Sequence, residues 1–268
     1  MTVGSADLAN QVGTVRHLVE ETCTEDLLGA FPSIQGIYLS GSLARGDWAP
    51  GYSDIDLIAV GENVEGDEVC ELRELVQKVV GDVEVSVSAK NVVDLGKGKV
   101  EAFILALDSV LLAGEDLLGK PETPDQSCIK EYGKRVLKRQ VEDWIRHTEE
   151  KRTPGVGEDA SGSVYMVLKL AQSALLSKGL VCLGAGEILA RFAEEFGREE
   201  LFSYVREACE LRSRWETARA DKERIEGFSN RAVRFAHLLS RRLGMRLRRG
   251  VEARIEKEGR GSTPSGSS

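Results

Sequence analysis

A pair of acidic residues inside an apolar run constrains the fold of this chain more than any other feature. Residues 41–60 read GSLARGDWAPGYSDIDLIAV, which places Asp54 and Asp56 among Ile55, Leu57 and further aliphatic residues. Side chains two apart on a strand share a face, so both carboxylates project together while the aliphatic side chains enter a core. Like charges on a part-buried surface repel unless a cation lies between them. The pattern therefore predicts a strand with a metal site on one face.

Carboxylate pairs of this kind suit Mg²⁺, which keeps several waters and prefers carboxylate and phosphate oxygens. The alternative is two ordinary polar residues on a half-exposed strand, and it is disfavoured because acids are depleted in strands. The alternating stretch DVEVSVSA, residues 82–89, supplies a third acid on the polar face of another strand. Glu84 is our choice for that acid, and Asp82, on the same face, is the alternative.

Gly41 and Ser42 form a turn shortly before the acidic strand. Glycine permits a backbone conformation that other residues resist. We expect the Gly41 amide, with the amide and hydroxyl of Ser42, to bind phosphate oxygens where a helix begins. A Gly-Ser turn alone is weak support for a nucleotide site, and its position ahead of an acid-x-acid strand makes it strong.

The N-terminal half of the chain mixes helix and strand signals, whereas the C-terminal half shows helical periodicity alone. Helices are predicted within 6–30 and 67–81, and strands at 34–39, 53–61, 82–89 and 109–114. We therefore predict an α+β fold in three parts: a mixed sheet with flanking helices over 1–125, an all-α helical bundle over 126–250 and a disordered tail over 251–268.

Charge and composition narrow the functional class. The net charge is −8 and the pI about 5.2, which argues against a general nucleic-acid binder, although residues 241–254 are strongly basic. No apolar run approaches the roughly 20 residues that span a bilayer, and the N-terminus lacks the pattern of a signal peptide. The five cysteines are scattered, as in a reducing compartment. We expect a cytoplasmic protein with no membrane partner.

The stretch LSGSLARGDWAPGYSDIDLIAV resembles the signature of the DNA polymerase β-like nucleotidyltransferases: an apolar residue, Gly-Ser, a spacer, Asp-x-Asp and a later strand acid. The strand VEVSVSA is similar to its equivalent in the aminoglycoside (streptomycin/spectinomycin-type) adenylyltransferases, whose C-terminal helical bundle the second half resembles in layout. The resemblance implies Asp54, Asp56 and Glu84 as catalytic metal ligands, with Glu84 alternatively the base. The nucleotide-binding residues that it implies are Gly41, Ser42, Arg45, Ser53 and Lys178.

The activity implied by the resemblance is transfer of a nucleoside monophosphate, AMP from ATP, with two Mg²⁺ ions and release of pyrophosphate. The acceptor would be a hydroxyl of a small molecule such as an aminoglycoside. One alternative is an antitoxin-like enzyme that adenylylates a protein, and another is a nucleotide-binding module without turnover. We do not expect a nucleic-acid acceptor, and we expect the protein to be a monomer or a homodimer.

The sequence leaves the roles of several further residues open. Arg45 either contacts the nucleotide or pairs with Asp47, and Lys178 either reaches the triphosphate or is an ordinary helix-end lysine. Trp48 either stacks on a ligand or anchors its loop to the sheet. Arg231 and His237 have the Arg-x5-His spacing of HEPN-type ribonucleases. On a helix, however, they would lie about 120° apart, so a capping or surface histidine is preferred.

Overall fold

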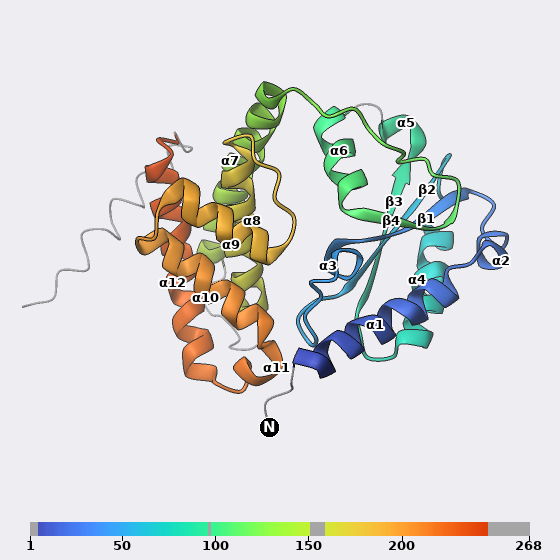
Figure 1. Ribbon diagram of the computed structural model, residues 1–268, viewed down its shortest axis with the longest axis horizontal. Helices are drawn as coiled ribbons and strands as arrows, with labels where there is room; N and C mark the ends of the chain where they lie inside the picture. The colour runs from blue at the N-terminus through green and yellow to red at the C-terminus, as the bar shows by residue number, and fades with distance from the viewer. Residues whose placement is uncertain (1–4, 96–97, 151–158, 246–268) are drawn as a thin grey trace, which may run out of the picture. The chain divides into compact units, whose positions relative to one another are not determined.

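Figure 1 shows the computed structural model, which describes residues 5–95, 98–150 and 159–245. The chain forms two compact units, Met1–Cys128 and Ile129–Ser268. The predicted disordered tail, residues 251–268, lies outside the described residues. Each unit is built around its own core, and each is described by itself.

The first unit contains four strands and six helices in its described part. The strands are β1 (Ile34–Ser40), β2 (Ile55–Gly61), β3 (Val85–Asn91) and β4 (Ser109–Gly114). The helices are α1 (Ser5–Thr22), α2 (Glu25–Leu28), α3 (Gly41–Arg45), α4 (Gly66–Val80), α5 (Val92–Leu95) and α6 (Lys99–Leu107).

The four strands form one mixed sheet in the order β3-β2-β1-β4. β1 runs antiparallel to both β2 and β4, and β2 runs parallel to β3. The parallel pair requires a crossover, which α4 supplies. As a result, the C-terminal end of β1 meets the N-terminal ends of the other three strands at a single edge of the sheet.

Helices cover both faces of this sheet (Figure 1). One face buries Ile37, Leu39 and Leu57 against α1 and α4, including Leu72 and Val76. The other face is covered at one end only, as a second cluster shows: Tyr38, Ile58 and Val60 pack against Val92, Leu95, Leu105, Leu117 and Leu118. Alternation along β2 therefore puts Asp56 on the same face as this smaller cluster, beyond its end.

The second unit is helical throughout its described part. Its helices are α7 (Gln126–Glu150), α8 (Asp159–Leu176), α9 (Ala185–Phe196), α10 (Glu200–Ser213), α11 (Trp215–Ala218) and α12 (Lys222–Arg242). α8 packs against α9, α10 and α12. α7 approaches the end of α8 closely at Gly133, where an added Cβ would lie 2.4 Å from the Leu176 carbonyl carbon. Only glycine fits this helix contact.

The predicted α+β class is confirmed: a four-stranded mixed sheet with helices is followed by a helical region. Two local predictions need correction. Residues 41–45 form a short helix where the sequence suggested a tight turn running into a loop, and the strand after Asp82 starts later, at Val85. Helices α5 and α6 were not predicted from the sequence. Among the helices of the described ranges, none is long and apolar enough to cross a membrane.

Candidate active site

The sequence-predicted acids gather at the edge of the sheet where β1 ends. Asp54 directly precedes β2, Asp56 is its second residue, and Glu84 directly precedes β3. Ile55 N donates a hydrogen bond to Glu84 O at 2.8 Å, which continues the parallel pairing of β2 and β3 to this point. Register places Asp56 opposite Ser40, the last residue of β1. The fold thus brings acids 30 residues apart in sequence to neighbouring strand ends.

Gly41 follows β1 and lies against one of these acids. Its φ is +71°, a region that favours glycine. A Cβ added at Gly41 would lie 2.4 Å from Asp56 Oδ2, a separation that no relaxed structure tolerates. The glycine is therefore required twice, by the backbone and by the space that the Asp56 carboxylate occupies.

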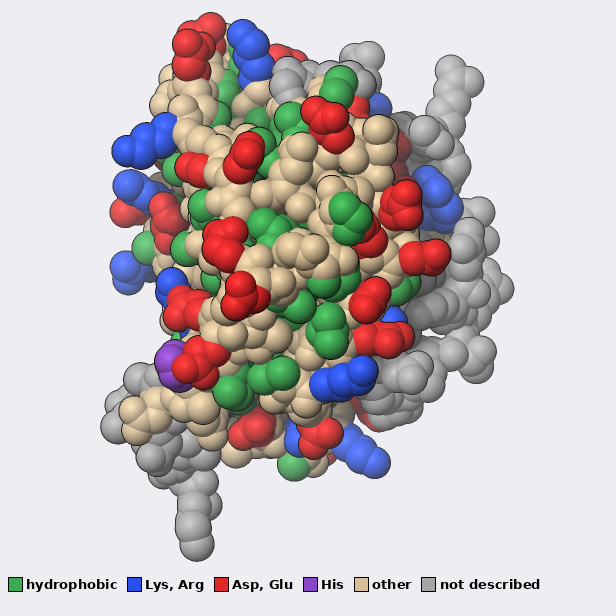
Figure 2. Space-filling model, turned by 90° about the vertical axis from the view of Figure 1, so that its right-hand side faces the viewer, with side chains coloured by type: hydrophobic (Ala, Val, Ile, Leu, Met, Phe, Trp, Pro, Cys, Tyr) green, Lys and Arg blue, Asp and Glu red, His purple; other side chains and the backbone are tan. Residues whose placement is uncertain are grey.

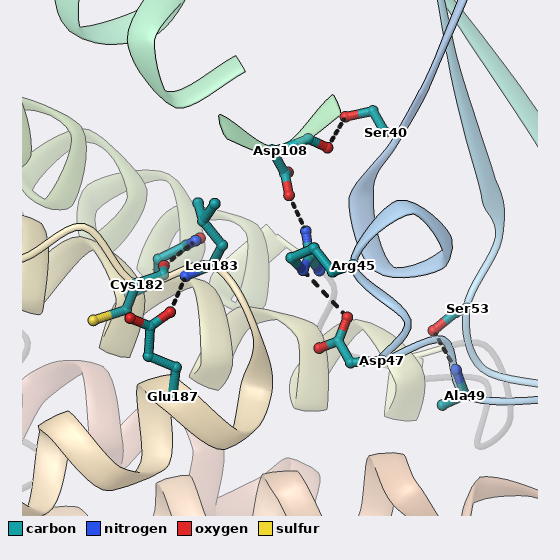
Figure 3. A network of polar contacts seen from close by, with 10 residues as sticks. Ser40, Arg45, Asp47, Ala49, Ser53, Asp108, Cys182, Leu183 and Glu187 are labelled. Carbon is teal, nitrogen blue, oxygen red and sulfur yellow. Dashed lines mark hydrogen bonds and ion pairs between the residues drawn. The ribbon is translucent and has the colours of Figure 1, made fainter. Parts of the chain in front are cut away.

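The Gly41 amide itself is already a donor within the protein. Gly41 N donates to Asp108 O at 3.1 Å, and Ser40 Oγ donates to the same carbonyl at 3.2 Å (Figure 3). In the structure, the amide that was expected to bind phosphate is paired with a protein carbonyl. The cause is the pairing of β4 beside β1, which brings the Asp108 carbonyl to the turn.

Arg45 ends the short helix α3, and its guanidinium pairs with two carboxylates (Figure 3). Nε lies 3.2 Å from Asp47 Oδ1, and Nη1 contacts Asp108 Oδ1. The pair with Asp47 was one of the two expected roles of Arg45. The pair with Asp108 was not expected, although Asp108 precedes β4 directly, as Asp54 precedes β2.

The loop between α3 and β2 is held by Trp48 and Ser53. Trp48 is 5% exposed and belongs to the main core of the unit, which favours the anchoring role over stacking on a ligand. Its Nε1 is buried without a hydrogen-bond partner in the described part of the chain. Ser53 Oγ accepts from Ala49 N at 3.1 Å and Ser53 N donates to Ala49 O at 2.8 Å, so Ser53 closes the loop just before Asp54.

The carboxylates are not gathered around one point. Asp54 and Asp56 are half-buried, while Glu84 and Asp82 are exposed. Within residues 5–95, 98–150 and 159–245, no three His, Cys, Asp or Glu side chains are grouped to hold a metal ion. All four acids come from the same end of the sheet. Their hard oxygen donors, at neighbouring strand ends and beside the space left by Gly41, nevertheless fit a divalent cation that completes its shell with water and phosphate oxygens.

The second unit contains the remaining residues that the sequence singled out. Lys178 is exposed just beyond α8, with its Nζ 6.0 Å from the Phe196 ring centroid. Arg231 Nη2 lies 2.8 Å from both carboxylate oxygens of Glu207. Because α12 is one continuous helix, Arg231 and His237 remain about 120° apart around its axis, and Arg231 is engaged in an ion pair.

Comparison with known proteins supports the class of this site. Residues 17–113, a span that contains the Gly41 turn, all the candidate acids of the first unit and all of β4 but its last residue, match the model of the nucleotidyltransferase domain family. A domain of this family supports transferase chemistry, the transfer of a nucleoside monophosphate. The match covers most of the first unit.

The chain is also similar to a solved structure, that of a provisionally assigned nucleotidyltransferase from Sulfolobus solfataricus. The identity is 23%, over 43% of this chain and 94% of that one, with a TM-score of 0.28. A likeness at that score adds nothing on fold or site. A search among curated proteins found no match.

Proposed function

We propose that the first unit transfers AMP from ATP to a hydroxyl group of an acceptor and releases pyrophosphate. One observation carries the proposal: the Gly41 turn, Asp54, Asp56 and Glu84 converge at one edge of the sheet, inside the segment that matches the nucleotidyltransferase domain family. The four positions come from the starts of two strands, β2 and β3, and from the helix after β1, so their proximity is a property of the fold and not of local sequence.

The acids would hold the metal and the acceptor. Asp54 and Asp56 would bind Mg²⁺ ions, and Glu84 would complete a second metal position or act as the base. When bound, the ions would neutralise the phosphates and stabilise the leaving pyrophosphate. The acceptor oxygen would form a bond to the α-phosphorus as the bond from that phosphorus to the bridging oxygen breaks, and the hydroxyl proton would pass to Glu84 and then to water.

The nucleotide would be held in line by the turn and the loop beside these acids, so positioning supplies much of the rate. Ser42, only 9% exposed, would contact the triphosphate together with Ser53, and Arg45 would contribute to the same nucleotide site. Gly41 would act by keeping the space beside Asp56 open. Lys178 of the second unit is a further candidate for a phosphate contact.

A small cationic acceptor, such as an aminoglycoside, suits the charge of the protein. The net charge is −8, and the face drawn in Figure 2 carries many acidic side chains, with basic ones mostly near its margins. Acidic surfaces attract cationic ligands, whereas nucleic-acid acceptors need an extended basic surface. The free cysteines, Cys23 and Cys70 among them, accord with a cytoplasmic location. We retain a monomer or homodimer as the expected state.

The first test is pyrophosphate release by the purified protein with Mg²⁺ and ATP, across a panel of aminoglycosides and protein acceptors. Release that requires an acceptor, and that disappears in Asp54→Ala and Asp56→Ala, would support the proposal and define the acceptor class. A protein acceptor in place of a small molecule would select the protein-adenylylating alternative. ATP binding without release over the whole panel would favour a binding module, and lack of ATP binding would overturn the proposal.

A matched pair of variants tests the third acid. Glu84→Gln should abolish most of the release, because its main chain is fixed beside Ile55 at the edge of the site. Asp82→Asn changes the same kind of group two residues earlier in the exposed turn before β3 and should leave release near the parental rate. The reverse result would assign the third carboxylate to Asp82.

A further inference from the structure

The turn between β1 and the acidic strand is fastened at both ends by one residue, Asp108. At the N-terminal end of α3, the Asp108 carbonyl accepts hydrogen bonds from Gly41 N at 3.1 Å and Ser40 Oγ at 3.2 Å. At the C-terminal end, the Asp108 carboxylate pairs with the Arg45 guanidinium. α3 is only five residues long, too short to be stable alone, so its conformation depends on such outside contacts.

Asp108 is itself held firmly in place. It caps the end of α6, where its amide donates to Ile104 O at 3.0 Å, and it leads directly into β4. Register then places Ser109 opposite Ser40. The contact therefore ties the turn to the junction of a helix and a strand, which is a rigid part of the unit.

A carboxylate is electrostatically unfavourable at this position. The C-terminal end of a helix carries partial negative charge, and α6 ends next to Asp108. Asp56 lies close to Gly41, whose amide binds the Asp108 carbonyl. Arg45 offsets these charges: its Nε pairs with Asp47 while its Nη1 pairs with Asp108, a fork that a lysine ammonium does not reproduce.

We propose that the Arg45–Asp108 ion pair is a clamp that holds the Gly41–Arg45 turn in the conformation required for nucleotide binding. Arg45 is then a positioning residue that acts through Asp108, and Asp108 is a residue of the site that the sequence motif does not contain. The side chains of both residues are 23% exposed, so the pair is screened less than a fully exposed one. The proposal rests on the proposed function, since it assumes that the turn meets a nucleotide.

The test combines a double-mutant cycle with hydrogen exchange. Arg45→Gln, Asp108→Asn and the double variant are compared for ATP dissociation constant, for KM and kcat in pyrophosphate release, and for amide exchange of residues 41–47. Asp108→Asn keeps the carbonyl contacts and the shape of the side chain, so it removes only the charge. Arg45→Lys keeps the charge and loses the fork.

The clamp predicts that Asp108→Asn, Arg45→Gln and Arg45→Lys each weaken ATP binding by about tenfold and raise exchange in the turn, with kcat at saturating ATP changed far less. The double variant should bind ATP no more weakly than either single variant, because both members act as one unit. Asp47→Asn is the matched control: it removes the other carboxylate on Arg45, which belongs to the same loop and does not tie the turn to β4. Its effect should stay within about twofold.

Three results would overturn the clamp: parental exchange and ATP binding in Asp108→Asn, an equal effect of Asp47→Asn, or additive losses in the double variant. Parental ATP binding in Arg45→Lys would also contradict it, since Arg45 would then serve as a simple charge. Failure of the proposed function is separate. It would appear as absence of ATP binding in the unaltered protein, and the exchange data would still decide whether Asp108 fastens the turn.

Discussion

The two ends of one face of the sheet differ sharply, as Tyr38 and Ser40 on β1 illustrate. Tyr38 is covered by an apolar cluster from α5, α6 and the segment after β4. Its hydroxyl lies 3.1 Å from Glu115 O and accepts from Leu118 N at 3.1 Å. Two residues further along the same face, Ser40 lies opposite Asp56 and donates to Asp108.

The two ends differ in the surroundings of their polar groups. At the Tyr38 end, polar atoms satisfy one another and the surrounding side chains exclude water, which stabilises the fold. At the Ser40 end, the half-buried Asp54 and Asp56 come from the same strand end, and two like charges there cost stability unless a ligand binds. One end thus supports the structure, and the other is set up for a ligand, at the expense of stability.

Loss of Asp56 gives the largest expected contrast between the two ends. Asp56→Ala should lower nucleotidyl transfer by about a hundredfold or more, because the charge beside the phosphates is lost. The unfolding temperature should change little, because the half-buried Asp56 is one of two like charges at this strand end. Asp116→Ala at the opposite end removes a carboxylate that accepts from Gly119 N, so it should lower the unfolding temperature and leave transfer within about twofold.

Thermal unfolding and pyrophosphate release, measured on the same preparations of both variants, make this comparison. Equal losses of activity in Asp56→Ala and Asp116→Ala would contradict the division of the face into a binding end and a structural end. So would a large fall in unfolding temperature for Asp56→Ala.

Gly41 gives the next largest effect. Gly41→Ala should destabilise the fold by about 1–3 kcal/mol through backbone strain and should also push Asp56 aside. A displacement of that size lowers transfer by up to about a hundredfold. Gly46→Ala is the matched control, because Gly46 also has positive φ, +78°, but nothing lies within 4 Å of an added Cβ.

The two glycine variants should therefore lose similar stability and very different activity. Urea unfolding gives the first quantity and pyrophosphate release the second. If Gly46→Ala lost as much activity as Gly41→Ala, backbone strain alone would explain both losses of activity. Displacement of Asp56 would then not be the cause of the loss in Gly41→Ala.

The sequence predicted the acids at one end of the sheet better than it predicted the residues and helices that hold the sheet and its turn in place. Asp54, Asp56 and Glu84 stand out locally, because a strand period of two and flanking aliphatic residues reveal which face an acid occupies. Short apolar runs identified β1, β2 and β4 with boundaries close to those observed. The local sequence pattern is therefore enough to predict where a strand lies and which face each of its side chains occupies.

Asp108 was missed because its role depends on pairing between distant segments. Only the antiparallel register of β1 and β4, with Ser40 opposite Ser109, brings its carbonyl to Gly41. Strand order and register are set by packing of the whole unit, which no local period encodes. The helices α5 and α6, which cover the Tyr38 end, escaped notice for a similar reason: α5 has four residues and α6 nine, too short for a clear helical period.

Tyr38→Phe tests the structural end with a smaller change. It should cost about 1 kcal/mol of stability, because Leu118 N and Glu115 O lose a buried partner while the ring keeps its packing. Burial raises the pKa of Tyr38 above its ordinary 10.0, so this stabilisation is complete below pH 10 and is lost as the pH rises through the raised pKa. Denaturant unfolding at pH 7 measures the loss of stability, and unfolding at alkaline pH shows whether the difference from the parental protein disappears. Any loss of nucleotidyl transfer in Tyr38→Phe would contradict a purely structural role.

Ser40→Ala should have the smallest effect on stability, about 0.5 kcal/mol, although Ser40 is almost as buried as Tyr38. The reason lies in the acceptor: without the serine hydroxyl, the Asp108 carbonyl still receives Gly41 N at 3.1 Å, so no buried polar atom is left without a partner. ATP affinity should change by less than about twofold, because the Arg45–Asp108 pair and the Gly41 contact both remain. A loss of stability as large as that of Tyr38→Phe, measured under the same conditions, would mean that the turn depends on the hydroxyl. The binding end would then be supported by its side chains as tightly as the structural end.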